Sequence, residues 1–154
     1  MMRFGNRQEI AFPNEVAHFD LLGESIITFD TGREDPQRII GFSNSELLEI
    51  TAECQIFQMD GTFKIVPSQF DQLYTIHGWY RGRCFPLLYA LLPNRAQATY
   101  QRLLQFLSQQ TPNQSPKFII DMEMAAKNAI LSQFPTASIV FCFFHFAQVT
   151  FIQV

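Results

Sequence analysis

Several short apolar runs bounded by turn residues lie between residue 25 and residue 93 and predict strands. SIITFD (25–30) and RIIGF (38–42) are joined by a segment that contains glycine and proline, which marks a chain reversal. CQIFQMD (54–60) is apolar at both odd and even positions, as is typical of a strand in the middle of a sheet. QLYTIHGWY (72–80) and CFPLLYALLP (84–93) surround RGR and predict an antiparallel hairpin.

Helical periodicity is found in two segments before residue 111. SNSELLEI (43–50) has Ser43 and Glu46 in the spacing of a capping box and predicts a short helix. From Ala96 onward, apolar residues recur on one helical stripe, with Asn94 predicted as the N-cap. The stripe consists of Tyr100, Leu103, Leu104 and Leu107.

The last part of the chain alternates between strand and helix. KFIID (117–121) predicts a buried strand, MEMAAKNAILSQF (122–134) a helix, and ASIVFCFF (137–144) another strand. From Cys54 the order is therefore three strands, helix, strand, helix, strand. This order predicts an α/β domain with a mixed sheet and flanking helices. It is the order of a ribonuclease H-like fold, although other α/β folds share it.

Composition and charge narrow the class of protein. Hydrophobic residues make up 47% of the 154 residues, which is typical of a folded domain rather than a disordered chain. The longest apolar run, SIVFCFFHFA, is too short to span a bilayer, and the N-terminus lacks the pattern of a secretory signal. A formal net charge of −3 argues against binding nucleic acid through bulk positive charge.

Two carboxylates are predicted to follow central strands. Asp60 stands at the end of one apolar run and Asp121 at the end of another. In open α/β sheets ligands collect at strand ends, and two such carboxylates can share a hard divalent cation such as Mg²⁺. Lys64, shortly after Asp60, can face a phosphate. The alternative is that Asp60 forms a turn and Asp121 caps a helix, and spacing alone favours that alternative.

A Cys-x-x-His pair ends the last predicted strand. Cys142 and His145 are spaced like half of a zinc site, but the sequence offers no second half with suitable spacing. From the residues alone, the favoured interpretation is a buried thiol beside a histidine at a helix start.

Four separated segments resemble the transposase domain of Mutator-like elements, the MULE family. They are MDGTFKIVPSQFDQLYTIHG, PLLYALLPNRAQATYQRLLQFL, PKFIIDMEMAAKNAI and CFFHFAQ, in family order and spacing. The resemblance implies a ribonuclease H-like catalytic core, cut-and-paste DNA transposition and Mg²⁺ or Mn²⁺ as cofactor. It also implies a nuclear protein with DNA as its partner, allows a homo-oligomer, and gives no reason to expect a membrane.

The resemblance also assigns residue roles. Asp60 in DGTFK matches the motif of the first catalytic acid, and Asp121 in IIDMEMAA matches that of the second. Both aspartates would then be metal ligands. Cys142 and His145 match a Cys-x-x-His motif implied to lie beside the active site and to position the DNA end, a role to which we also assign Lys64.

The chain departs from the family in its third acid. No Asp or Glu follows Glu123, which itself matches a position within the second motif. We therefore expect a C-terminally incomplete, partial catalytic core over residues 54–154, preceded by a strand hairpin and short helix over residues 1–53. We expect little or no catalysis from it. The alternative is a domesticated, non-catalytic remnant that acts as a protein-interaction or DNA-associated module.

Overall fold

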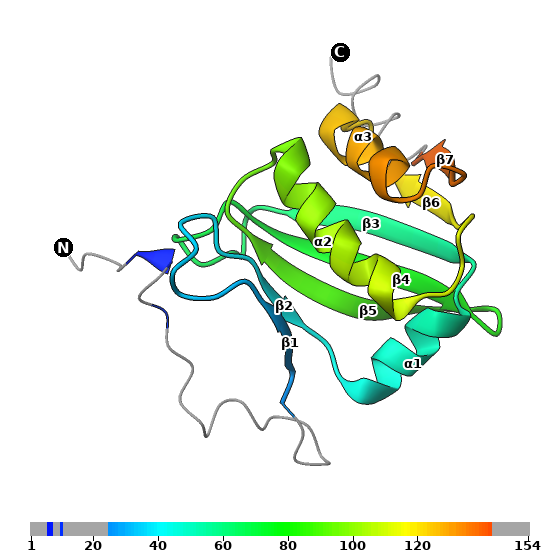
Figure 1. Ribbon diagram of the computed structural model, residues 1–154, viewed down its shortest axis with the longest axis horizontal. Helices are drawn as coiled ribbons and strands as arrows, with labels where there is room; N and C mark the ends of the chain where they lie inside the picture. The colour runs from blue at the N-terminus through cyan, green and yellow to red at the C-terminus, as the bar shows by residue number, and fades with distance from the viewer. Residues whose placement is uncertain (1–5, 8–9, 11–24, 143–154) are drawn as a thin grey trace.

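The computed structural model describes residues 6–7, 10 and 25–142. Within them the chain forms one seven-stranded mixed sheet and three α-helices (Figure 1). In chain order the elements are β1 (Ile27–Asp30), β2 (Ile40–Phe42), α1 (Ser45–Glu53), β3 (Ile56–Thr62), β4 (Gln72–Tyr80), β5 (Arg83–Leu92), α2 (Gln97–Gln110), β6 (Lys117–Ile120), α3 (Met124–Gln133) and β7 (Ser138–Phe141).

The sheet has the order β1-β2-β5-β4-β3-β6-β7, with β3 between the antiparallel and the parallel part. β3, β4 and β5 pair antiparallel as a meander, whereas β6 pairs parallel with β3 and β7 parallel with β6. This confirms the predicted mixed α/β sheet with flanking helices and is consistent with a ribonuclease H-like fold. The hairpin of β1 and β2 extends the same sheet, because β2 pairs with β5. A domain boundary at residue 53 stays a prediction.

The core lies between the sheet and the helices. Figure 1 shows α2 lying across one face of the sheet, with α1 and α3 on either side of it. Phe57 of β3 and Phe118 of β6 stack on this face with ring centroids 5.5 Å apart, and Phe118 also contacts Phe134 at the end of α3. The predicted stripe of α2 is buried against them. No helix in the described part of the chain is long and apolar enough to cross a membrane.

The β4–β5 hairpin is closed by a two-residue turn. Arg81 and Gly82 both have positive φ, at 49° and 76°, as a type I′ turn requires. Just before the turn, Gly78 lies so close to Leu87 and Cys54 that a Cβ there would meet the Leu87 side chain and lie 2.6 Å from the Cys54 Sγ. The hairpin predicted around RGR is therefore confirmed.

The N-cap residues of α1 and α2 differ from the predicted Ser43 and Asn94. The residue that caps α1 is Asn44, whose Oδ1 accepts the Leu47 N–H at 2.9 Å, while the Ser43 hydroxyl donates to the Leu87 carbonyl. The predicted cap Asn94 lies before α2, whose N-cap is Ala96. The Asn94 Oδ1 still accepts the Ala96 N–H at 2.9 Å, so it orders the approach to the helix.

Candidate active site at the carboxyl ends of β3 and β6

Strand register brings the two predicted aspartates to neighbouring positions. Ile56 pairs with Lys117 and Gln58 with Ile119, so each paired residue of β3 lies beside the residue 61 positions later in β6. Extending this register by two residues along both strands puts Asp60 beside Asp121. Adjacent strands lie about 4.8 Å apart. The two aspartates, far apart in sequence, therefore lie toward the carboxyl ends of neighbouring parallel strands.

The expected strand boundaries differ at both aspartates. Asp60 does not end β3: it pairs with Thr75 of β4, and the strand continues through Gly61 to Thr62. Asp121 instead comes directly after β6, which ends at Ile120. The backbone of Asp60 is held by its pairing with β4, and Asp60 and Asp121 are both half-buried.

A buried hydrogen-bond chain leads to a third carboxylate beside this pair. The Gln72 Nε2 donates to the Tyr100 Oη at 2.8 Å, and that hydroxyl donates to the Glu123 Oε1, also at 2.8 Å. Burial raises the pKa of Glu123 above its ordinary value, and the charge of Asp121 raises it further, while the Tyr100 hydrogen bond and the charge of Arg95 oppose the rise. Glu123 is thus a carboxyl group close to other acids and partly shielded from water.

The hydroxyl of Tyr74 also lies at this edge. Tyr74 is 2% exposed, and its Oη has no hydrogen-bond partner among the described residues. Burial raises the pKa of this hydroxyl well above its ordinary value, and neighbouring groups add to the rise: Tyr100, Asp121, Glu123 and Asp60. The hydroxyl is therefore a buried group without a partner among the described residues, in a region of negative charge.

The donor set suits a hard cation that keeps part of its hydration shell. Among the described residues there is no group of three or more His, Cys, Asp or Glu side chains placed to hold one metal ion. Mg²⁺ is commonly bound through one or two carboxylates, with water and substrate phosphate filling its remaining positions. Asp60 and Asp121 fit that kind of binding.

The residues predicted to position DNA are placed only in part. Cys142 follows β7, its N–H donates to the Ile120 carbonyl at 2.6 Å, and it is half-buried. Because Ile120 pairs with Phe141, continuing the register sets Cys142 beside Asp121. Lys64 lies exposed in the loop after β3, while His145 lies outside the described residues. The DNA-positioning roles of Cys142, His145 and Lys64 stay predictions.

Several side chains at this edge were missed by the sequence interpretation. Tyr100 was assigned only to the apolar stripe of a helix, and Gln72 and Tyr74 only to a strand. A glutamine at an inward-facing strand position was the available signal, since a buried amide needs polar partners. Arg95, which stacks on Phe63, carried no signal in the sequence.

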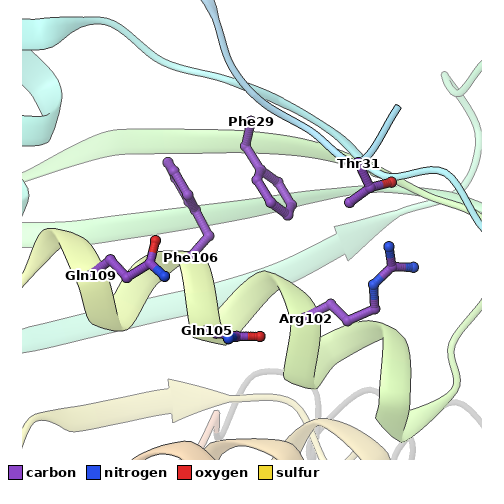
Figure 2. Close-up of a pocket in the computed structure, with 6 residues that line it drawn as sticks. All are labelled: Phe29, Thr31, Arg102, Gln105, Phe106 and Gln109. Carbon is purple, nitrogen blue, oxygen red and sulfur yellow. The ribbon is translucent and has the colours of Figure 1, made fainter. Parts of the chain in front are cut away.

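A separate cavity of about 240 Å³ lies between β1 and α2. Phe29 and Phe106 line it and stack on each other, with ring centroids 4.8 Å apart (Figure 2). Thr31, Arg102, Gln105 and Gln109 complete its lining. The cavity shares no residue with the acidic edge, and Arg102 is already engaged by Asp35 at 2.5 Å.

Comparison with known proteins identifies the family to which most of the chain is similar. The family model of the MULE transposase domain matches residues 56–149, which is more than half of the chain. The match begins at the first residue of β3 and includes both aspartates and the Cys-x-x-His pair. No curated protein matches the chain.

Proposed function

Because the chain belongs to the MULE transposase domain family, we propose that Asp60 and Asp121 are two acids of a site for metal-dependent DNA strand cleavage and transfer. The family is that of enzymes of DNA transposition, and such transposases generally work with divalent metal ions. The observation that supports the assignment is the parallel β3–β6 pairing from Ile56–Lys117 to Gln58–Ile119, which puts the two aspartates side by side when it is extended along both strands.

The two aspartates would hold Mg²⁺ or Mn²⁺ through their carboxylate oxygens. A bound ion of this kind neutralises charge that develops on a reacting phosphate. The pairing of Asp60 within β3 keeps its carboxylate in a fixed place, since β4 and β6 flank that strand. Lys64 would approach a phosphate of the DNA, and Cys142 and His145 would position the DNA end.

We further propose that this chain cleaves DNA little or not at all. No Asp or Glu follows Glu123 in the sequence, so a later third acid of the family pattern is missing from it. With two acids, charge on the reacting phosphate is less well stabilised. The same observation favours a second candidate function, that of a domesticated, non-catalytic module that associates with DNA or protein. Nuclear residence and self-association belong to this proposal.

Metal titration tests the assignment of the aspartates. Mn²⁺ binding is measured by calorimetry on the unaltered chain and on Asp60→Asn and Asp121→Asn. We expect binding to be lost or at least tenfold weaker in both variants. Glu53→Gln is the matched control, because this exposed carboxylate lies just before the opposite end of β3. Equal binding by all four proteins contradicts the site, and no binding by any of them favours the non-catalytic candidate.

A nicking assay tests the expected inactivity. Supercoiled DNA is incubated with the chain and Mg²⁺ or Mn²⁺, and we expect no nicking above that of Asp60→Ala. Metal-dependent nicking by the unaltered chain that is lost in Asp60→Ala would overturn the proposal of inactivity, while supporting the role of Asp60.

A further inference from the structure

Arg95 is held in place by two contacts although half of its side chain is exposed. Its guanidinium carbon lies 3.7 Å from the centroid of the Phe63 ring, which is a close cation–π contact. Its Nε donates to the Asp71 Oδ2 at 3.0 Å. The exposed fractions are 50% for the Arg95 side chain and 43% for that of Asp71, so this ion pair contributes little to stability. What the two contacts do is orient the guanidinium.

The oriented guanidinium lies at the acidic edge of the sheet. Phe63 directly follows β3, three residues after Asp60, and its ring lies next to Gly61, where a Cβ would be 3.4 Å from it. Arg95 directly follows Asn94, whose carbonyl accepts a hydrogen bond from the Gln72 Nε2 at 3.4 Å, and the same Nε2 donates to the Tyr100 hydroxyl that is bonded to Glu123. Arg95 therefore approaches the acidic edge from the loop before α2.

We propose that Arg95, oriented by Phe63 and Asp71, binds a phosphate of the DNA strand beside the Asp60–Asp121 pair. The inference rests on the proposed function and adds a DNA-binding residue to it. The hydrogen bond to Asp71 uses Nε, which leaves the two terminal nitrogens to bind a ligand. A guanidinium can hold two phosphate oxygens at once through parallel N–H donors.

Charge and exposure support DNA as the occupant. A chain with a net charge of −3 has little bulk positive charge with which to attract DNA, so an individual, oriented cation gains importance for the contact. Two large apolar side chains next to residues of the acidic edge are exposed: Ile65 is 74% exposed in the loop after Phe63, and Met122, next to Asp121, is 55% exposed. Such side chains suit contact with sugars and bases rather than with phosphates.

The experiment measures DNA binding without divalent metal, so that it is independent of the aspartate site. Fluorescence anisotropy of a labelled duplex oligonucleotide is recorded over a series of NaCl concentrations for the unaltered chain and for Arg95→Gln. We expect about tenfold weaker binding for Arg95→Gln, and a slope of log K against log[salt] that is smaller by about 1, since one phosphate contact is lost.

Arg81→Gln is the matched control. Arg81 also stacks on an aromatic ring, that of Tyr80 at 4.9 Å, but it lies in the β4–β5 turn at the other end of the sheet. Its removal takes away the same charge, and we expect the salt slope to be unchanged. Arg95→Lys keeps the charge but not the paired donors, so we expect it to restore the salt slope and only part of the affinity.

The outcomes separate the inference from the proposed function. An unchanged slope in Arg95→Gln, an equal loss in Arg81→Gln, or no DNA binding by the unaltered chain would overturn the role of Arg95. Mn²⁺ titration of Arg95→Gln should match that of the unaltered chain, because Arg95 is not a metal ligand. Loss of Mn²⁺ binding in Arg95→Gln would show that the substitution disturbs the fold around the aspartates instead of removing only a phosphate contact, and so would also count against the inference.

Discussion

The two ends of the central strands β3, β4 and β5 differ in how their side chains are packed and hydrogen-bonded. At the hairpin end, Gly78 admits Leu87 and Cys54 into close contact, and the turn at Arg81 and Gly82 has the backbone geometry that its position requires. At the carboxyl end, the buried Tyr74 hydroxyl has no hydrogen-bond partner among the described residues, and the charges of Asp121, Glu123 and Asp60 contribute to its raised pKa. The hairpin end is distinguished by tight packing, whereas the carboxyl end combines an unpaired hydroxyl with negative charge.

This difference separates stability from chemistry within one sheet. Like charges and an unsatisfied hydroxyl cost folding free energy, and local rules of this kind are commonly broken where a protein has a function. The hairpin end has one such group, since the buried Nδ1 of His77, next to Gly78, has no hydrogen-bond partner among the described residues. The contrast predicts that substitutions at the hairpin end lower stability, while some substitutions at the carboxyl end raise it.

The largest effect is expected at the tightly packed glycine. Gly78→Ala forces a methyl group against Leu87 and Cys54, and overpacking of this kind should lower the free energy of unfolding by about 2–3 kcal/mol. Gly61→Ala is the counterpart at the carboxyl end, where a Cβ would meet the amide oxygen of Gln72, the end of a side chain whose Nε2 donates to Tyr100. The amide can shift only by straining that hydrogen bond, so we expect a cost of about 1 kcal/mol, smaller than at Gly78. Urea denaturation of both variants measures the difference, and equal costs would remove the contrast in packing.

The next effect concerns the hydrogen-bond chain. Tyr100→Phe removes the acceptor of Gln72 and the donor to Glu123, so we expect a loss of about 1.5 kcal/mol in the free energy of unfolding. Thermal unfolding at neutral pH measures it. Tyr89→Phe, which alters a 39% exposed tyrosine of β5, should leave stability unchanged. An unchanged stability of Tyr100→Phe would indicate that these two hydrogen bonds contribute nothing to the free energy of unfolding.

A smaller effect of opposite sign is expected for the unpaired hydroxyl. Tyr74→Phe keeps the ring packed on Tyr100, at a centroid distance of 5.1 Å, and deletes the orphaned Oη. In protein free of metal and DNA we expect stability to rise by about 1 kcal/mol, since an unsatisfied buried group is removed. Urea denaturation tests the sign. A clear destabilisation would mean that the hydroxyl has a partner in the folded protein.

The subtlest effect is a dependence on pH. The folded-state pKa of Glu123 is raised above 4.5 by burial and by Asp121, so its favourable contribution is present below pH 4.5 and is lost as the pH rises through the folded-state pKa. Glu123→Gln removes this ionisation. The stability of the variant relative to the unaltered chain should therefore increase with pH above 4.5.

Melting temperatures of both proteins between pH 4 and pH 8 measure the effect. Glu53→Gln, an exposed change at the hairpin end, controls for the loss of one negative charge. A difference between Glu123→Gln and the unaltered chain that stays constant across this range would contradict the assigned environment of Glu123.

The element order could be predicted from the sequence, because it depends on local pattern. Apolar runs and helical stripes identified the elements from Ile27 to Phe141, and RGR identified the tight hairpin. The boundary at Asp60 was wrong because the neighbouring strand β4 keeps pairing with Gly61 and Thr62, and a single strand does not contain that information. The caps of α1 and α2 were displaced for a similar reason, as several polar residues compete near each helix start.

The polar side chains around the aspartates could not be predicted, because tertiary packing brings them together. Tyr100 meets Glu123 only when α2 crosses the sheet next to α3, and Tyr74 reaches the same edge from another strand. Arg95 and Phe63 are separated by the whole β4–β5 hairpin in sequence. Helical stripe and strand patterns report burial, but they do not report which buried hydroxyl will face a carboxylate.

The β3–β6 register has an evolutionary consequence. Descendants of this domain can lengthen or shorten the hairpin turn and the segments around α2 without parting Asp60 from Asp121, because the alignment is set inside the strands. An insertion or deletion of one residue within β6 would instead slide every side chain to the other surface of the sheet. Lineages should therefore vary in length between these strands and stay constant within them.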